Sequence, residues 1–343
     1  MGSRPTEISG APRAGPHNRV TDVPGILVGN ADDALARTGV TVLLCERPMV
    51  AAVDVRGGGP GTRETDALGL AGSVDTVDAV VLSGGSAFGL AAASGVQASL
   101  AKAGRGFAVG PVRVPIVPQA ILFDMLNGGD LARREGDFYA RLGMDALSVA
   151  GVNFALGSAG AGFGATIAGL RGGLGSASIV LTDGTAIGAL AAVNAVGSVT
   201  IGDTWHFWAG GLERNGEFGG RGLPNPFPAD AAIPRLKGGV RESTTIAVVA
   251  TDARLDKRQC HRLAVMAQTG LARAIFPVHT PLDGDVVFAI STGDRPLTDP
   301  FHDLTLIGAA ASNTLARAIA RAVYEAAPSP DARMPPSYRE RFA

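Results

Sequence analysis

Thr244 and Thr245 stand between a polar, glycine-containing lead-in and the continuous apolar run 246–250. The run is too short and too rich in β-branched residues for a helix, and Thr251 and Asp252 end it. The segment 239–252 therefore predicts a buried strand that begins at one of the two threonines. A strand of this kind has to lie inside the core, so it constrains the fold more than any other segment of the chain.

A threonine at the start of such a strand has two interpretations. Threonine is a common strand residue, and the local sequence alone favours a purely structural role. The alternative is a nucleophile, because cleavage of the bond before Thr244 would place its own α-amine within reach of its hydroxyl. An unperturbed α-amine has a pKa of about 7.7–8.0, close enough to neutrality to accept the hydroxyl proton.

Composition places the chain among globular proteins with a large core. The 343 residues are 46% hydrophobic and only 18% charged, which suits one large domain or two. The 48 glycines and few aromatics indicate tight turns and close backbone packing, as in layered folds of helices and sheets. A net charge of −1 gives no electrostatic footprint for nucleic acid or an anionic membrane. Cys45 and Cys260 lack metal-type spacing, so no metal, cofactor or disulfide framework is expected.

Both ends of the chain are expected to be tails. Residues 1–20 carry prolines and scattered arginines without an apolar central region, which predicts a flexible segment rather than a signal peptide. Four prolines within 328–336 predict that ordered helix ends there and that 328–343 is a C-terminal tail. No segment is long and apolar enough to span a bilayer, so a cytoplasmic protein is expected.

The chain between the tails mixes helical and strand patterns. Short apolar runs predict strands at 40–44, 50–53, 79–82, 179–181, 189–192 and 199–201. The alanine-rich segment 85–102 predicts a helix, Asp256 is expected to cap a second one, and apolar residues at helical spacing predict a third over 304–323. Residues 204–241 form a long irregular stretch before the proposed cleavage point, and loops of that length are usually functional or disordered.

Three polar residues stand out beside predicted strands. Asp283 and Asp285 flank a glycine before the apolar run 286–290, and positions two apart on an extended chain point to the same side. Two carboxylates on one side can orient an ammonium group, although an Asp-Gly-Asp turn is the simpler interpretation. Asn194 lies within an apolar run, where a buried amide needs specific partners.

Six blocks occur in an order that resembles a known enzyme family. They are 54–66, 82–90, 160–162 with 164–166, 172–176, the Thr244 segment and 279–285. In these blocks the chain is similar to the L-aminopeptidase/D-esterase (DmpA-like) family of N-terminal-nucleophile hydrolases, which includes β-peptidyl aminopeptidases and nylon-oligomer hydrolases. The likeness runs from about Val23 to about Val323, nearly the whole chain.

The resemblance implies an α+β fold, an αββα layered sandwich of the DmpA and ornithine-acetyltransferase type, with one domain over 21–327. It also implies self-cleavage between Ser243 and Thr244 into associated fragments 1–243 and 244–343. The substrate would be a small peptide or amide with a free amino end, and the processed heterodimers would form a homo-oligomer.

Roles for individual residues follow from the same resemblance. Thr244 would attack an amide carbonyl, Asn194 would stabilise the oxyanion, and Asp283 with Asp285 would position the amine. Ser86 and Phe123 are expected to bind substrate.

The chain departs from the family pattern at three positions. Phe123 stands where relatives often have a tyrosine, Gly169 where they usually have a lysine, and Ser243 where many have asparagine or glycine. The only lysines are Lys102, Lys237 and Lys257. None falls in a motif, so a lysine-assisted mechanism lacks an obvious donor.

Other functions remain open from the sequence. An acyltransferase of the ornithine acetyltransferase type would share the fold and the threonine chemistry, and a non-enzymatic binding homologue would keep the fold alone. Residues 160–165 fit a dinucleotide-binding pattern, but the glycine-rich residues that follow do not suit the required helix. Ser86 lies on a plausible strand-turn-helix, yet Phe88 stands where a nucleophile elbow needs glycine. The five histidines are scattered and are interpreted as surface or core residues.

Overall fold

The computed structural model describes residues 11–238 and 243–342. Its strands are β1 (Ile26–Asp33), β2 (Thr38–Val55), β3 (Thr62–Arg63), β4 (Thr76–Ser83), β5 (Phe107–Val109), β6 (Val112–Val114), β7 (Gln119–Ile121), β8 (Thr166–Ile167), β9 (Leu170–Arg171), β10 (Gly173–Val180), β11 (Ala186–Asn194), β12 (Thr244–Ala253) and β13 (Val286–Arg295). Its α-helices are α1 (Ser86–Gly89), α2 (Ala92–Lys102), α3 (Phe138–Ser148), α4 (Lys257–Ala274), α5 (Pro300–Tyr324) and α6 (Tyr338–Phe342).

Nine of these strands form one mixed sheet. Its order is β10-β11-β12-β13-β2-β4-β7-β3, and β1 pairs with β2 beside this path. The pairs β12–β13 and β4–β7 are parallel, and the other pairs are antiparallel. The strand β2 is 18 residues long, and its pairing shifts register between Leu44 and Met49. Its first half pairs with β1 and β4 and its second half with β13, so β2 joins the two halves of the sheet.

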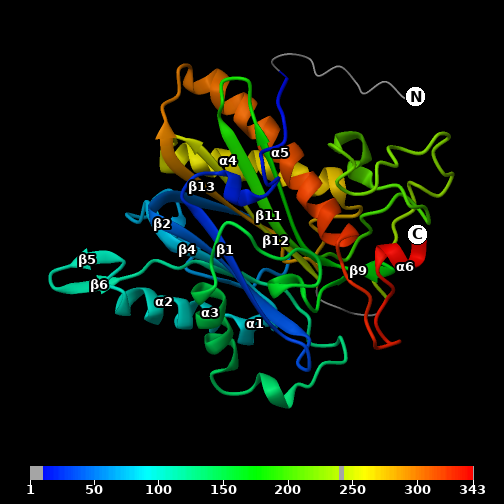
Figure 1. Ribbon diagram of the computed structural model, residues 1–343, viewed down its shortest axis with the longest axis horizontal. Coiled ribbons are helices and arrows are strands. Elements are labelled where there is room, and N and C mark those ends of the chain that lie inside the picture. The colour runs from blue at the N-terminus through cyan, green and yellow to red at the C-terminus, as the bar shows by residue number, and fades with distance from the viewer. Residues whose placement is uncertain (1–10, 239–242, 343) are drawn as a thin grey trace.

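Three apolar clusters show how the layers are stacked. One cluster joins α4 and α5 to one face of β10–β13, and a second joins α2 and α3 to one face of β2 and β4. Between them, a third cluster joins side chains of β1, β2 and β4 to the other face of β10–β13. Figure 1 shows the two helix pairs on opposite sides of the strands. The expected αββα sandwich is therefore confirmed, and its two β layers belong to one continuous sheet.

The segment that begins at Thr244 is a central strand of this sheet. β12 lies between β11 and β13, and every one of its ten residues is buried. Ile246 and Val248 face the cluster between the β layers, whereas Ala247 and Val249 face α4 and α5. Apolar side chains on both faces explain why the run is continuous rather than alternating.

The glycines of β10 allow α5 to lie directly against the sheet. A Cβ atom on Gly175 would come within 1.9 Å of the Ala318 carbonyl oxygen, and one on Gly173 within 2.3 Å of the Ala322 carbonyl oxygen. Side chains at these positions would push the helix away. The glycine-rich block 172–176 thus has a packing role, which the composition had indicated in general terms.

Several predicted elements are confirmed with changed boundaries. The runs 40–44 and 50–53 belong to the single strand β2, and 85–102 divides into α1 and α2. Within residues 199–201 only Thr200 forms an isolated bridge, to Phe207, so the prediction of a strand was wrong. Asp256 caps α4 as expected, because its carboxylate accepts a hydrogen bond from the Gln259 backbone N–H at 2.7 Å.

The described parts of both expected tails are packed against the domain. Arg13 forms a β-bridge with Val180, and Val20 is fully buried, so the described residues 11–20 are not a free tail. At the other end, α6 packs Tyr338 on Phe207 with the ring centroids 4.6 Å apart, and Tyr338 is buried. The prediction that ordered helix ends at the prolines was wrong, because α6 follows them and its Tyr338 covers apolar surface of the domain.

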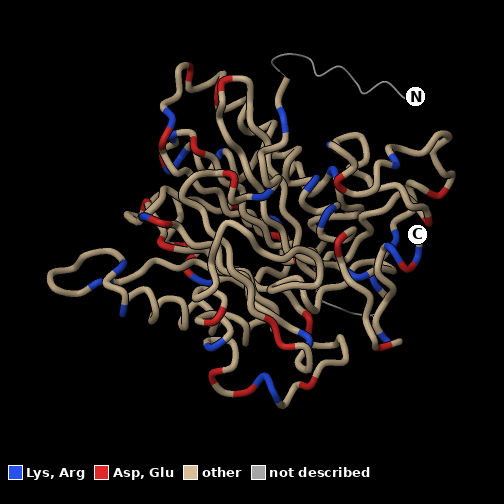
Figure 2. Tube along the Cα trace, in the orientation of Figure 1, with Lys and Arg blue, Asp and Glu red and all other residues tan. Residues whose placement is uncertain are grey.

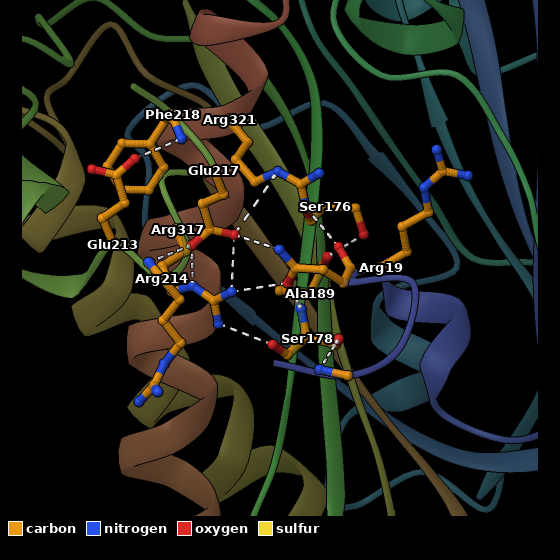
Figure 3. A network of polar contacts seen from close by, with 12 residues as sticks. Arg19, Ser176, Ser178, Ala189, Glu213, Arg214, Glu217, Phe218, Arg317 and Arg321 are labelled. Carbon is orange, nitrogen blue, oxygen red and sulfur yellow. Dashed lines mark hydrogen bonds and ion pairs between the residues drawn. The ribbon is translucent and has the colours of Figure 1, made fainter. Parts of the chain in front are cut away.

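A buried ion pair joins the long irregular stretch to α5. The guanidinium of Arg317 meets both carboxylate oxygens of Glu217 at 2.5 and 2.9 Å, and it donates to the Ser178 carbonyl and to Asn18 Oδ1 (Figure 3). The two charged side chains are 1% and 5% exposed. Glu217 precedes the proposed cleavage point and Arg317 follows it, so this contact would join the two processed fragments.

Charged residues lie mainly at the periphery of the domain. Figure 2 shows blue and red segments interspersed in the loops and helix ends, which fits the net charge of −1. Among the described helices, none has both the length and the apolar character needed to cross a membrane.

Candidate active site

The ends of three neighbouring strands bring together Thr244, Asn194 and the two aspartates. Thr244 is the first residue of β12 and pairs with Asn194, the last residue of β11. β13 runs parallel to β12, so the loop that carries Asp283 and Asp285 enters the sheet beside the start of β12. The structure therefore brings together residues that are up to 91 positions apart, as the sequence predicted.

The carbonyl group of Ser243 is held between two donors in the continuous chain. Its oxygen accepts the Gly284 backbone N–H at 2.8 Å and the Thr244 hydroxyl at 2.5 Å. The Ser243 N–H in turn donates to the Leu282 carbonyl at 2.9 Å, and Ser243 is 1% exposed. The peptide bond that would be cut is therefore buried, fixed on both sides and in contact with the Thr244 hydroxyl.

Gly284 has no room for a side chain. A Cβ atom there would lie 2.8 Å from Thr244 Oγ1 and 2.6 Å from the Gly59 carbonyl oxygen. The glycine between the two aspartates thus allows the backbone N–H to approach the Ser243 carbonyl without displacing the threonine hydroxyl.

The two buried carboxylates organise the backbone around this bond. Asp285 Oδ1 accepts the Thr245 N–H at 2.7 Å, and its Oδ2 accepts the His279 N–H at 3.1 Å. Asp283 Oδ1 accepts the Val196 N–H at 3.2 Å, and its Oδ2 accepts both the N–H and the hydroxyl of Thr280. Each aspartate is 1% exposed. Burial raises the pKa of Asp283, and the adjacent charge of Asp285 raises that pKa further.

His279 belongs to the site, contrary to its interpretation as an unremarkable surface or core residue. Its Nδ1 lies 2.9 Å from Asp285 Oδ2, and its backbone is in the left-handed region with φ 55°. The position of His279 in the same block as the aspartates was the available signal, and its isolation from other histidines concealed it.

Asn194 has its amide orientation fixed by neighbours. Its Oδ1 accepts the Thr166 N–H at 3.0 Å and the Lys237 ammonium at 2.8 Å, while its Nδ2 donates to the Phe123 carbonyl at 3.0 Å. One N–H of the amide remains for another acceptor. The amide is fully buried, as its apolar surroundings in sequence predicted.

Lys237 is the residue that the sequence argument missed. It lies in the irregular stretch seven positions before Thr244, yet its ammonium reaches Asn194, so the conclusion that the chain lacks a lysine for the site was wrong. Gly169, where relatives have a lysine, occupies a tight turn between β8 and β9 with φ +76°. It lines a different cavity from the one beside Asn194. The rarity of lysine in this chain was the one signal that could have drawn attention to Lys237.

A cavity of about 230 Å³ opens beside Asn194 and Lys237. Phe123 lines it, whereas Ser86 does not. Ser86 instead starts α1 with φ 53°, and its N–H donates to the Leu122 carbonyl one residue from Phe123. A larger cavity of about 570 Å³ reaches Ala253, at the other end of β12 and about 30 Å of strand from Thr244.

In the described chain, no group of three or more His, Cys, Asp or Glu side chains is arranged to hold a metal ion. Cys45 and Cys260 are free and buried, and burial raises the pKa of the Cys45 thiol to about 12.

The fold agrees with comparisons to known proteins. The model of peptidase family S58 matches residues 18–333. An uncharacterized aminopeptidase of Mycobacterium tuberculosis is 43% identical over 95% of this chain and 98% of its own length. A 6-aminohexanoate-oligomer endohydrolase of Kocuria sp. is 30% identical over 88% of this chain and 84% of its own.

The fold has a solved counterpart. The L-aminopeptidase D-Ala-esterase/amidase of Ochrobactrum anthropi, described as a variant of the Ntn hydrolase fold, superposes with a TM-score of 0.66 at 22% identity, covering 96% of this chain and 93% of that one. With the family match and the layered fold together, the chain belongs to peptidase family S58, is a peptidase or amidase, and has a fold similar to that variant of the Ntn hydrolase fold.

Proposed function

We propose that the protein cuts its own Ser243–Thr244 bond and then uses Thr244 as an N-terminal nucleophile on short peptides or linear amides with a free amino end. The observation that carries the proposal is the Ser243 carbonyl, which accepts hydrogen bonds from the Gly284 N–H and from the Thr244 hydroxyl. The first donor can stabilise negative charge on the carbonyl oxygen, and the second group is the attacking one.

Self-cleavage begins with the Thr244 hydroxyl oxygen attacking the Ser243 carbonyl carbon. Negative charge then develops on the Ser243 oxygen, where the Gly284 N–H donates at 2.8 Å. The carbon–nitrogen bond breaks, and the proton lost by the hydroxyl goes to the leaving Thr244 amine. Water hydrolyses the resulting ester, which leaves a carboxylate on Ser243 and a free amine and hydroxyl on Thr244.

Turnover uses the groups that cleavage exposes. The new α-amine accepts the Thr244 hydroxyl proton, and the remaining N–H of Asn194 is available for the oxyanion of the substrate. Asp285 already binds the backbone N–H of Thr245, one residue from the new amine, so its charge is close enough to orient the ammonium form. Asp283 supports the same loop through Thr280 and Val196.

A small linear substrate suits this site. The cavity beside Asn194 holds about 230 Å³, below the range typical of pockets for drug-sized ligands. Relatives named as aminopeptidases and as 6-aminohexanoate-oligomer endohydrolases support a substrate whose units are joined by amide bonds. The acidic pair beside the nucleophile supports a preference for substrates that carry an amino group near the cleaved bond.

Two measurements test the proposal. Intact mass and N-terminal sequencing of the purified protein should show a fragment that begins at Thr244, and Thr244→Ala should stay uncut. A series of aminoacyl amides, each with a free and an acetylated amine, should be hydrolysed only in the free form. A wild-type protein that remains as uncut as Thr244→Ala would refute self-cleavage, and equal rates on both forms would refute the requirement for a free amine.

We also infer that the processed heterodimers assemble into a homo-oligomer and act in the cytoplasm. The hairpin β5–β6 projects from the domain (Figure 1), and its pairing places four exposed apolar side chains, Phe107, Val109, Val112 and Val114, on one face. A second copy of the chain would cover that face. Two free buried thiols suit a reducing compartment.

A further inference from the structure

Lys237 occupies a position that the catalytic roles assigned so far do not explain. It is 9% exposed, although it belongs to an irregular stretch, and its backbone N–H donates to the Val196 carbonyl at 2.8 Å. This anchor directs the side chain inward, where the ammonium donates to the Asn194 Oδ1 at 2.8 Å and to the Thr166 carbonyl at 3.0 Å. Burying an ammonium group is costly, so a buried lysine needs such specific acceptors.

The contact with Lys237 helps to fix which way the Asn194 amide faces, together with the Thr166 N–H and the Phe123 carbonyl. An amide oxygen has two lone pairs, and here the Thr166 N–H and the Lys237 ammonium use both. If the amide were rotated by 180°, its NH₂ group would face the Lys237 ammonium and the Thr166 N–H. All three groups are hydrogen-bond donors, so neither contact would be a hydrogen bond. Lys237 therefore keeps Nδ2, with its one remaining N–H, on the side opposite to the ammonium.

We propose that Lys237 is the positioning residue of the oxyanion site: it holds the Asn194 amide in its donating orientation and strengthens that donor by polarising the amide. The inference rests on the proposed hydrolysis by Thr244. A cation 2.8 Å from the amide oxygen draws electron density toward that oxygen and makes the Nδ2 hydrogens better donors.

The cavity beside the two residues makes this role testable. Lys237 and Asn194 both line the cavity of about 230 Å³, so a small molecule that enters it reaches the place of the lysine side chain. If Lys237 is shortened to alanine, propylammonium has the length and the donors of the missing part of the side chain. Tetramethylammonium carries the same charge but has no N–H group, so it separates hydrogen bonding from charge alone.

The experiment measures kcat and KM on a small aminoacyl amide, with rates normalised to the cleaved protein that intact mass detects. Lys237→Met should lower kcat by about ten- to hundredfold with little change in KM, less than the loss of an oxyanion donor itself, because Lys237 acts through Asn194. Lys237→Arg should keep an intermediate rate. The matched control is Lys257→Met, since Lys257 donates to the Gly72 carbonyl far from this cavity, and it should keep the wild-type kcat.

Rescue provides the second readout. Propylammonium should restore part of the kcat of Lys237→Ala, should not affect Lys237→Met, and should act better than tetramethylammonium. Wild-type kcat in Lys237→Met, or equal rescue by both cations, would overturn the role of Lys237. A wild-type protein without any turnover would instead refute the proposed function and this role with it, so the two failures are distinguishable.

Discussion

Replacing Arg317 by methionine is expected to destabilise the domain strongly and to weaken the association of the two processed fragments. Arg317 follows the proposed cleavage point, and its main partner Glu217 precedes it, with Nε and Nη2 at 2.5 and 2.9 Å from the carboxylate oxygens. The side chains are 1% and 5% exposed. Methionine fills much of the same space, so the substitution removes the charge and the hydrogen bonds with little loss of volume.

The magnitude follows from what the substitution leaves behind. Glu217 would stay buried with the Asn18 amide, the Arg214 backbone N–H at 3.2 Å and the more distant Arg321, 4.0 Å away, as its partners. Removing one partner of a buried pair typically costs about 3–5 kcal/mol, because the remaining charge is left uncompensated. The whole free energy of unfolding of a domain is about 5–15 kcal/mol, so the loss is a large fraction of it. The Ser178 carbonyl and Asn18 Oδ1 lose donors as well.

Urea denaturation of the processed protein, with size-exclusion chromatography at each concentration, measures both effects. The matched control is Arg339→Met, also beyond the cleavage point, where the pair with Glu325 is 53% and 32% exposed. A pair that exposed contributes about 0–1 kcal/mol, so this variant should resemble the wild type. The double variant Glu217→Gln, Arg317→Met should recover part of the loss, because it removes the uncompensated charge. An Arg317→Met midpoint equal to that of Arg339→Met would refute this account of the ion pair.

Four further outcomes are expected. Thr244→Ser should retain more self-cleavage and turnover than Thr244→Ala, because the serine hydroxyl can still attack the carbonyl; equal losses in both assays would contradict the nucleophile assignment. Gly284→Ala should slow self-cleavage in a time course of intact mass, whereas Gly59→Ala, whose Cβ would meet only atoms at 3.8 Å or more, should cleave normally. Burial and then the charge of Asp285 raise the pKa of Asp283. The Asp283 carboxyl group therefore binds its proton more tightly in the folded state than in the unfolded state. The wild type should therefore lose stability relative to Asp283→Asn as pH rises from about 4 through the raised pKa, and parallel urea-unfolding profiles over that range would contradict this. Val112→Lys on the exposed hairpin should lower the mass found by light scattering, and a monomeric wild type at micromolar concentration would refute the oligomer.

The sequence by itself determined the features that depend on local pattern. The apolar run after Thr244 could only be a buried strand, and Asp256 had the side chain that caps a helix start. Family blocks in order along nearly the whole chain indicated the layered fold and the grouping of Asn194 and Thr244. These predictions succeed because neighbours in sequence decide periodicity and capping, and because motif order reflects the fold as a whole.

Only the tertiary structure decided the contacts between segments that have no shared pattern. Lys237 lies in a stretch without periodicity, and its contact with Asn194 depends on how that stretch passes over the end of β11. The Gly284 N–H meets the Ser243 carbonyl only because the loop before β13 enters the sheet beside β12. Tyr338 is buried because it stacks on the ring of Phe207, which belongs to a distant segment of the chain. Such contacts arise from the burial of whatever surfaces the sheet and helices present, and a sequence does not reveal those surfaces until its elements are placed in space.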